Sequence, residues 1–488
     1  MTTTSDYVPP SPIAMPRVGA FRKGRRLVAT GATFGRHLAP ALVAGLTRRG
    51  TTHVPRAIRR AFEDLGSTYV KFGQFAGSVP DIVGHEVAAE FRSCLDAGPP
   101  VPFEQVRAVV EEDLGDRIGR LFASFDEQPV AAASISVVHR ATLPGGERVA
   151  VKVLRPGVEH LVATDLALLQ APIRFFALQG LDRAMALLSY LIGFQEQVAE
   201  ELDLRNEART MDYFRALLAD LELSRLHVPH VHHRLSSRRV LTMELLDGSP
   251  IDDLAEIEAR GLDPRPFVRQ LMQAWILTAM YVGVFHADIH AGNLLLTRDG
   301  RLGMLDWGIV ARLDPDTHTL VRSILEAALG IRSAWDELTA AFIRMHGASL
   351  RDGLGLSDEQ IRRVVRELME PVLTRPVGEV SMASLFGTSE EAIAIATGEP
   401  PRRRSLAGRW RLLRKTARTN RMKLSGGVLD SGFERASFLA AKQVVYLERY
   451  WKAYMPDEPL LADHDFLRAV LAHGGKDGGH AVTAAATG

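Results

Sequence analysis

His286-Ala-Asp288-Ile-His290-Ala-Gly-Asn293 opens a segment that ends with Asp306-Trp307-Gly308. The apolar run after Asn293 and the turn at Asp299-Gly300 predict a strand–turn–strand between the two ends. Two acids and an amide in this order suit phosphoryl transfer, because one carboxylate can take the proton of an attacking hydroxyl while hard oxygen ligands hold Mg²⁺. We therefore interpret Asp288 as a candidate catalytic acid–base, and Asn293 and Asp306 as candidate metal ligands.

A lysine-bearing strand upstream supports this interpretation. The segment Arg148-Val-Ala-Val151-Lys152-Val153-Leu154 follows a Pro-Gly-Gly turn and alternates β-branched residues around one lysine. In protein kinases such a lysine contacts the phosphates of ATP. Lys152 is thus a candidate catalytic residue. The small-residue run before it would let backbone N–H groups approach the same phosphates, which makes four residues candidates for cofactor binding: Ala131, Ala132, Ala133 and Ser134.

A helical carboxylate must orient the strand lysine in this chemistry. Apolar periodicity predicts a long helical region over residues 158–218, and its later part is rich in acids. Glu207 is our first candidate for the partner of Lys152, and Glu201 is the second. Both glutamates lie far from the catalytic segment along the chain, so the prediction that one of them pairs with Lys152 depends on the fold.

Residues 228–231 and 240–245 are predicted as the last two strands of the small sheet that carries the lysine. Glu244 and Leu245 close the second of these strands and are predicted to face the adenine ring. Four histidines nearby invite a metal site, but their spacing fits no common zinc pattern and soft ligands are absent; they are His227, His230, His232 and His233.

The chain after Gly308 lacks a feature of peptide kinases. It leads straight to a helix start at Asp314-Pro315-Asp316, with no recognisable activation segment. The residue before Asp288 is Ala287, where loop-phosphorylated kinases carry an arginine. Both facts argue against a peptide kinase controlled by loop phosphorylation. Helices are predicted in the remainder, at residues 317–329, 334–345, 358–373 and 434–454.

Composition limits the function classes. The chain has 488 residues, 46% of them hydrophobic, and a formal net charge of +1, so it has no global signature of nucleic-acid binding. Cys94 is the single cysteine, which excludes an intrachain disulfide. We find no secretory signal and no run of about 18 apolar residues. The sequence predicts a cytoplasmic protein without a transmembrane span.

Two basic segments suggest a peripheral contact with an anionic membrane. Residues 22–49 place cations around an apolar stretch, and residues 400–425 combine many arginines with Trp410. A solvated helix face and a solvated linker are the alternative interpretations. If a membrane is bound, we expect the contact at its inner face.

Five ordered motifs together resemble the AarF/UbiB family of atypical kinases, which is associated with quinone biosynthesis. The resemblance covers roughly residues 56–330 and includes a motif specific to that family among kinases, Lys71-Phe-Gly73-Gln74. The other four are Ala131-Ala-Ala-Ser134-Ile, Val151-Lys152, Glu201-Leu-Asp203 with Glu207, and the segment from His286 to Gly308.

The resemblance implies an α+β, bilobal protein-kinase-like fold, with a small antiparallel sheet in the N-lobe, a helical C-lobe and an N-terminal helical extension. It implies that Lys71 and Gln74 lie over the nucleotide site as regulatory residues, with Glu201 and Asp203 as their partners, and block the peptide groove. Family members bind ATP and Mg²⁺, and ATPase activity tied to a lipid or isoprenoid ligand is the chemistry we expect.

This chain departs from the family pattern in two places. The family's small-residue loop usually continues Ile-Gly-Gln-Val-His, whereas this chain has Ser136 and Val137 at the second and third of these positions. We expect nucleotide affinity or phosphate positioning to differ, because Ser136 lacks the conformational freedom of glycine. The catalytic segment has Ile289 and Ala291 where prolines are common, which changes rigidity and not the ligands.

We divide the chain into seven parts on these grounds. Residues 1–20 and 476–488 are predicted to be disordered ends. Between them we predict a helical extension at 21–125, an N-lobe at 126–247, a C-lobe at 248–399, a basic segment at 400–425 and C-terminal helices at 426–475.

Three functions fit these observations. The first is an atypical kinase or ATPase that supports isoprenoid-quinone metabolism at a membrane surface. The second is a nucleotide-binding pseudokinase scaffold, which the complete set of candidate catalytic residues disfavours. The third is a small-molecule phosphotransferase of the aminoglycoside or choline kinase type, which shares the missing activation segment but not Lys71-Phe-Gly73-Gln74. The sequence leaves open the phosphoryl acceptor, the quinone type and the oligomeric state.

Overall fold

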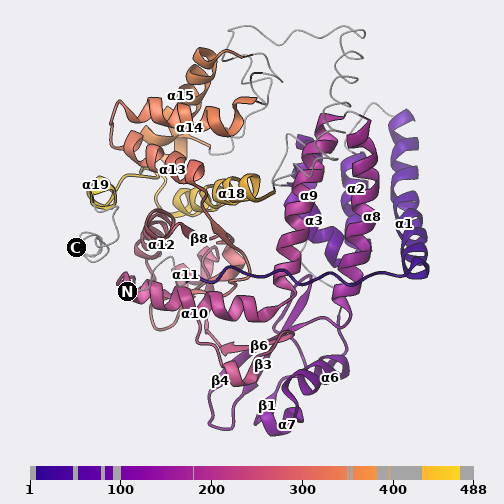
Figure 1. The fold of residues 1–488 in the computed structure, drawn as a ribbon. Helices are drawn as coiled ribbons and strands as arrows, with labels where there is room; N and C mark the ends of the chain where they lie inside the picture. Colours follow the sequence, from indigo (N-terminus) through magenta and orange to yellow (C-terminus); the bar gives the residue numbers. More distant parts are fainter. Residues whose placement is uncertain are drawn as a thin grey trace.

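The computed structural model describes residues 7–47, 53–77, 83–91, 100–179, 181–348, 351, 356–381, 395 and 431–472. The predicted basic segment, Cys94 and the predicted tail after residue 475 lie outside these residues. Two lobes and a flanking group of long helices make up the fold (Figure 1). This is the expected α+β, protein-kinase-like architecture with N-terminal helices.

An antiparallel sheet forms the smaller lobe. Its strands are β1 (Ser124–Phe125), β2 (Ala131–Ala132), β3 (Ser136–Thr142), β4 (Arg148–Leu154) and β6 (Val240–Glu244). The order is β1-β3-β4-β6, and β2 also pairs with β3. The two central strands meet at the predicted turn, where Gly146 adopts a left-handed φ of 86° that other residues rarely take.

Alternation along β4 decides which way Lys152 faces. Val149, Val151 and Val153 are buried on one face of the sheet, in a hydrophobic cluster covered by helix α6 (Phe103–Leu114). Successive strand residues point to opposite faces, so Lys152 lies on the other side. The short helix α7 (Ile118–Leu121) leads from α6 into β1. Val137 belongs to the same buried cluster, so this departure from the family pattern fills the lobe core.

The predicted long helical region is three helices in the structure. They are α8 (Val158–Leu178), α9 (Asp182–Glu201) and α10 (Leu204–Asp220). The second break has a clear cause, because Asp203 is extended, with φ −128°, and its carboxylate accepts a hydrogen bond from the Arg205 N–H as an N-cap. A new helix with its own direction starts there, and Glu207 stands in its first turn.

The N-terminal extension packs against this group. Helices α1 (Ala20–Thr47) and α3 (Ser67–Gly77) lie against α8, and α3 also contacts α9 (Figure 1). Helices α2 (His53–Leu65) and α5 (His85–Phe91) pack against α3, and α2 also contacts α1. A buried ion pair between Arg26 of α1 and Asp165 of α8, with N–O distances of 2.6 and 2.9 Å, links the two parts. Asp165 is fully buried, so this pair fixes the relative register of the two helices.

The N-terminal segment differs from the disorder expected for residues 1–20. From residue 7 onward it crosses the molecule from α10 to the start of α1 (Figure 1). The Ser11 N–H and C=O bond to the side chain of Asn206, and the Ile13 N–H donates to the Ala199 carbonyl. Tyr7 packs against Tyr213, with ring centroids 5.0 Å apart.

A second sheet lies at the start of the larger lobe. Its order is β5 (Leu226–His227), β10 (Leu302–Met304), β9 (Leu294–Thr297) and β7 (Gly248–Pro250). The predicted strand–turn–strand is therefore the β9–β10 hairpin. The predicted strand at residues 228–231 is wrong. Its place is taken by β5, which pairs in parallel with β10, and Val231 makes only an isolated bridge to Met243.

Helices complete the larger lobe. The first group is α11 (Leu254–Ala259), α12 (Arg265–Leu277) and the π-helix η3 (Thr278–Val282), which delivers the chain to β8 (Val284–His286). β8 pairs with β11 (Val310–Arg312), which leads directly into the remaining helices. These are α13 (Pro315–Ala328), α14 (Ala334–Ala348), α15 (Asp358–Thr374), α18 (Ser431–Tyr454) and α19 (His464–Ala472).

One described helix, α8, is long and apolar enough to cross a membrane by length and composition, and 33% of its most apolar window is buried. Core helices of soluble proteins meet the same criterion. The buried Asp165–Arg26 pair in the middle of α8 favours packing within the protein. The finding is compatible with the expected lack of a transmembrane span.

Candidate functional site

Lys152 meets Glu207 beneath the sheet. The Lys152 Nζ lies 2.9 Å from each carboxylate oxygen of Glu207 and 3.4 Å from Asp306 Oδ2. Glu207 is the first of our two candidates for this contact, and its side chain is only 4% exposed. The pair joins β4 to α10, so the position of that helix decides whether Lys152 is held in place.

Electrostatics keep Lys152 charged. Burial opposes the positive charge, but the carboxylates of Asp306 and Glu207 outweigh it and raise the pKa of Lys152. Burial also opposes ionisation of Asp306, and the nearby charge of Lys152, the Gly308 N–H and Lys71 together lower the pKa of Asp306. Asp306 is therefore an anion, and its side chain is 41% exposed. An exposed anion between two cations is suited to bind a metal ion with the phosphates.

Trp307 anchors the turn that carries Asp306. Its buried indole donates to the Met304 carbonyl at 2.9 Å and packs against Phe214 of α10 and His286, with ring centroids 4.6 and 4.4 Å apart. The Asp306 Oδ1 accepts a hydrogen bond from the Gly308 N–H at 2.9 Å. These contacts fix one carboxylate oxygen of Asp306 and leave Oδ2 toward Lys152.

His286 organises the catalytic segment as a neutral ring. Its Nε2–H donates to the Asp306 carbonyl at 2.7 Å, and its Nδ1 accepts from the Asp288 N–H at 3.1 Å. Burial lowers the pKa of His286 to about 4, and a second ring proton would face the Asp288 N–H. Asp288 and Asp306, 18 positions apart in the sequence, are thus tied to one imidazole.

Asn293 joins the same arrangement. It ends the 3-10 turn η4 (Ala291–Asn293), its Nδ2 donates to the Asp288 carbonyl at 3.1 Å, and its own carbonyl accepts from the Leu305 N–H at 2.9 Å. The Oδ1 of Asn293 is a candidate ligand oxygen beside the turn that carries Asp306. Among the described residues no group of three or more His, Cys, Asp or Glu side chains could hold a metal ion. The two hard oxygen donors fit a Mg²⁺ ion whose remaining ligands are phosphate oxygens and water.

The predicted regulatory residues divide into two sets. Lys71 of α3 forms an ion pair with Glu201, which Gln197 also contacts at 3.1 Å, and Gln74 lies almost one turn further along α3. Asp203 was expected to be a partner of Lys71 and Gln74, but its role in the structure is different. It caps α10 and pairs with Arg205 at 2.7 Å. Of the two expected acidic partners, Glu201 is the one that pairs with Lys71 of the extension.

The small-residue run is held against the sheet. Ala131 and Ala132 form β2, Ser134 is buried, and the Arg155 guanidinium donates twice to the Ala133 carbonyl, at 3.0 and 2.8 Å. This arginine gives the loop a fixed end close to β4. Contact of the loop with phosphates stays a prediction.

The predicted adenine-facing residues lie at the end of β6. The Glu244 carboxylate accepts hydrogen bonds from His227 Nε2 at 2.8 Å and from the His230 N–H at 3.2 Å. The hydrogen bond from His227 is the main reason why the pKa of Glu244 is lowered. The Leu245 N–H donates to the Arg148 carbonyl at 3.4 Å. Their role toward adenine stays a prediction.

Sequence analysis missed the contribution of α18. The Lys442 Nζ forms an ion pair with Asp288 Oδ1 at 2.7 Å, and the Tyr450 hydroxyl donates to the Ile289 carbonyl at 2.7 Å. Between them, Gln443 accepts from the Ile289 N–H at 3.0 Å and donates to the Ala287 carbonyl at 2.6 Å. One signal was available, because a glutamine and a tyrosine seven residues apart share one face of a predicted helix.

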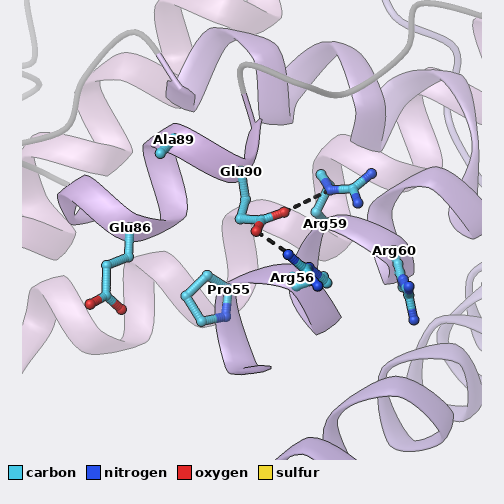
Figure 2. A pocket seen from close by; sticks show the side chains of 7 residues that line it. All are labelled: Pro55, Arg56, Arg59, Arg60, Glu86, Ala89 and Glu90. Atoms are coloured by element: carbon cyan, nitrogen blue, oxygen red, sulfur yellow. Dashed lines mark hydrogen bonds and ion pairs between the residues drawn. The ribbon is translucent and has the colours of Figure 1, made fainter. Parts of the chain in front are cut away.

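A separate surface pocket lies between α2 and α5. It is lined by Pro55, Arg56, Arg59, Arg60, Glu86, Ala89 and Glu90. Figure 2 shows Glu90 between Arg56 and Arg59, with the shortest contact of 2.9 Å made to Arg59. None of its residues belongs to the predicted site, and two of its three arginines pair with Glu90.

Comparisons with known proteins agree with this geometry. A model of the ABC1 atypical kinase-like domain matches residues 93–333. An uncharacterized aarF domain-containing protein kinase of Arabidopsis thaliana, described as chloroplastic, is 32% identical over 412 residues, which are 84% of this chain and 73% of that protein. An uncharacterized protein of Mycobacterium tuberculosis is 33% identical over 441 residues, which are 90% and 82% of the two chains.

More distant relatives include a probable protein kinase UbiB of Marinobacter nauticus, which is 29% identical over 66% of this chain and 59% of its own length. Among solved structures, the complex of Rv3197 with erythromycin from Mycobacterium tuberculosis has a TM-score of 0.42 and 21% identity over 80% of this chain and 88% of that one. The family assignment depends on the domain match and on the two relatives above 30% identity. The chain belongs to the ABC1/aarF-domain family of atypical, protein-kinase-like proteins.

Proposed function

We propose that this protein binds ATP with Mg²⁺ and acts as an atypical kinase or ATPase, in support of isoprenoid-quinone metabolism at a membrane surface. The observation that carries the proposal is the position of Lys152, 2.9 Å from Glu207 and 3.4 Å from Asp306. A buried lysine between two acids, one of them half-exposed, is the arrangement that holds nucleotide phosphates beside a metal ligand in kinases.

Each residue then has one role. Lys152 neutralises phosphate charge, and Glu207 keeps its ammonium group in position. Asn293 and Asp306 supply the protein ligands of Mg²⁺, which when bound stabilises negative charge on the phosphates. Asp288 accepts the proton of the attacking hydroxyl or water. The His286 ring orients Asp288 by accepting a hydrogen bond from the Asp288 backbone N–H.

The Lys71–Glu201 pair favours restrained turnover over rapid phosphorylation of a protein. Lys71 comes from the helical extension and lies close enough to Asp306 to lower the pKa of that carboxyl. A second cation at the metal ligand can hold a nucleotide in a fixed geometry until a ligand shifts the equilibrium. We propose a lipid or isoprenoid as that ligand, because the UbiB relatives belong to the same family.

The surface of α1 supports a peripheral membrane contact. Apolar and basic side chains are exposed along its first half, including Phe21, Arg22, Lys23, Arg25, Leu27 and Val28. Such a mixture is typical of helices that lie in the headgroup region of an anionic membrane. An electrostatic contact of this kind weakens as salt rises.

The test is steady-state ATP hydrolysis by the purified protein with Mg²⁺, with and without anionic liposomes. Asp306→Asn should abolish hydrolysis while the protein stays folded. The matched control is Asp316→Asn on α13, since that acid pairs with Arg344 at an exposed position and should leave hydrolysis unchanged. Stimulation by liposomes that falls with salt would support the membrane part of the proposal.

Two results would change the assignment. ATP binding without turnover under every condition would favour a nucleotide-binding pseudokinase scaffold. A defined phosphorylated hydroxyl compound, formed faster than ATP is lost to water, would favour a small-molecule phosphotransferase. Absence of ATP binding in the wild-type protein would refute the proposal itself.

A further inference from the structure

Lys442 contacts the candidate catalytic acid from a distant part of the chain. It lies on α18, and its Nζ is 2.7 Å from Asp288 Oδ1 across a separation of 154 residues. The chain contains only eight lysines among its 59 basic residues. Three of these lysines, from α3, β4 and α18, are ion-paired with acids of the site.

Each of the three lysines forms an ion pair with at least one acid of the site. Lys152 pairs with Glu207 and Asp306, and Lys442 pairs with Asp288. Lys71 pairs with Glu201. Burial opposes the charge on Lys442, and Asp288 and, more weakly, Glu201 raise its pKa. Glu201 has the same effect on Lys152. Asp288, the partner of Lys442, and Asp306, a partner of Lys152, are both bonded to the His286 ring, which places Lys442 in the same site.

The backbone around Lys442 is fixed, and its side chain is partly exposed. Gln443 bridges the Ile289 N–H and the Ala287 carbonyl, which holds α18 against the catalytic segment. The side chains of Lys442 and Asp288 are 23% and 16% exposed, so their ion pair is partly accessible to solvent. A partly accessible lysine on a fixed backbone can exchange one anionic partner for another.

The part of the catalytic segment from His286 to Asn293 contains no lysine or arginine. Between His286 and Asn293 the other basic residue is His290, whose Nε2 lies 3.7 Å from Asp288 Oδ2. Phosphoryl transfer needs a cation near the transferred group, and a cation supplied from elsewhere in a protein or by a partner accelerates it by roughly 10³–10⁵. Lys442 is the cation that the fold brings to Asp288.

We propose that Lys442 is a further residue of the phosphoryl-transfer site, which pairs with Asp288 in the nucleotide-free protein and binds the terminal phosphoryl group of a nucleoside triphosphate. This inference rests on the proposed function. It assigns to α18 a direct part in nucleotide binding, whereas Gln443 and Tyr450 on the same helix only position the catalytic segment.

Equilibrium binding of ATP and ADP, each with Mg²⁺, tests the inference because only ATP has the terminal group. Lys442→Met should weaken ATP binding about tenfold and ADP binding less than about twofold. Lys442→Arg keeps the charge and should remain within about threefold of wild type for ATP. Lys452→Met is the matched control, since Lys452 lies on α18 and pairs with Glu448, and it should change neither affinity.

A second variant protects the test against misfolding. Asp288→Asn releases Lys442 from its partner and should strengthen ATP binding relative to ADP, and it should lose this effect when combined with Lys442→Met. Equal losses for ATP and ADP in Lys442→Met, or no loss, would overturn the role of Lys442 while the proposed function stands. Failure of the wild-type protein to bind either nucleotide would overturn both.

Discussion

Replacing Gln443 by leucine should loosen the catalytic segment with little change in packing volume. Gln443 is fully buried, and its amide satisfies the Ile289 N–H at 3.0 Å and the Ala287 carbonyl at 2.6 Å. Leucine can satisfy neither group. Each buried backbone group left without a partner costs about 1–3 kcal/mol, so we expect the free energy of unfolding to fall by about 4 kcal/mol. That is a large part of the roughly 5–15 kcal/mol of a typical protein.

The matched control is Arg449→Leu on the same helix. Arg449 pairs with Asp252 at an exposed position, and an exposed ion pair contributes about 0–1 kcal/mol. Urea denaturation, followed by fluorescence, gives the change for both variants. Hydrogen exchange at the Ile289 amide reports the local effect and should accelerate in Gln443→Leu only. A loss in Gln443→Leu no greater than in Arg449→Leu would refute the claim that α18 holds this segment.

Ile289 offers an independent check of the same contact. Proline is common at this position in the family pattern, and proline has no N–H to donate. Ile289→Pro should therefore remove the donor of the hydrogen bond to Gln443 Oε1, whereas Gln443→Leu removes the acceptor. Because both substitutions remove one shared interaction, the double variant should lose less stability than the sum of the two single variants. Full additivity would mean that the two residues do not act together.

Three further predictions concern other parts of the site. Glu207→Gln leaves Lys152 without its closest anion and should weaken Mg-ATP binding about tenfold, whereas Asp212→Asn on the outer face of α10 should not; calorimetric titration compares them. His286 has a folded-state pKa of about 4, below the unfolded value of about 6.5. Its contribution to the free energy of unfolding is therefore complete above pH 6.5 and is lost as pH falls toward 4. Between pH 7 and pH 5, the free energy of unfolding measured by urea denaturation should therefore fall by about 2 kcal/mol more in wild type than in His286→Gln. Equal losses would contradict this. Asn206→Ala removes both bonds to Ser11 and should speed proteolytic cleavage within residues 7–19 without affecting β4, as mass spectrometry of early fragments would show.

Chemistry made much of the site predictable. Phosphate and metal binding restrict the residue types to lysine, acids and amides at fixed spacing, so Lys152, Asp288, Asn293 and Asp306 could be chosen from the sequence. Glu207 could be preferred over Glu201 without knowing that a new helix begins at residue 204. The structure supplies the reason, since the Asp203 cap turns the chain and carries Glu207 beneath β4.

The strand that pairs with β10 and the partner of Asp203 were not predictable from the sequence. The strand expected at residues 228–231 is apolar and β-branched, but pairing depends on which neighbour has an open edge. β10 offers its edge to Leu226–His227, slightly earlier in the chain. Asp203 was assigned to Lys71 by resemblance, whereas the nearer Arg205 pairs with it and the start of α10 uses it as a cap. Competition between neighbouring partners of this kind cannot be predicted from the spacing of residues in the sequence.

The role of α18 follows from what is missing after Gly308. The chain passes through β11 directly into α13, so no activation segment lies against the catalytic segment to support it. A short loop that carries an acid, a buried histidine and a candidate metal ligand still needs its backbone groups satisfied. In this protein α18 does so through Gln443 and Tyr450, and it brings Lys442 to Asp288 on the same helix. Support of the loop and neutralisation of its acid are therefore coupled, and any displacement of α18 should change both together.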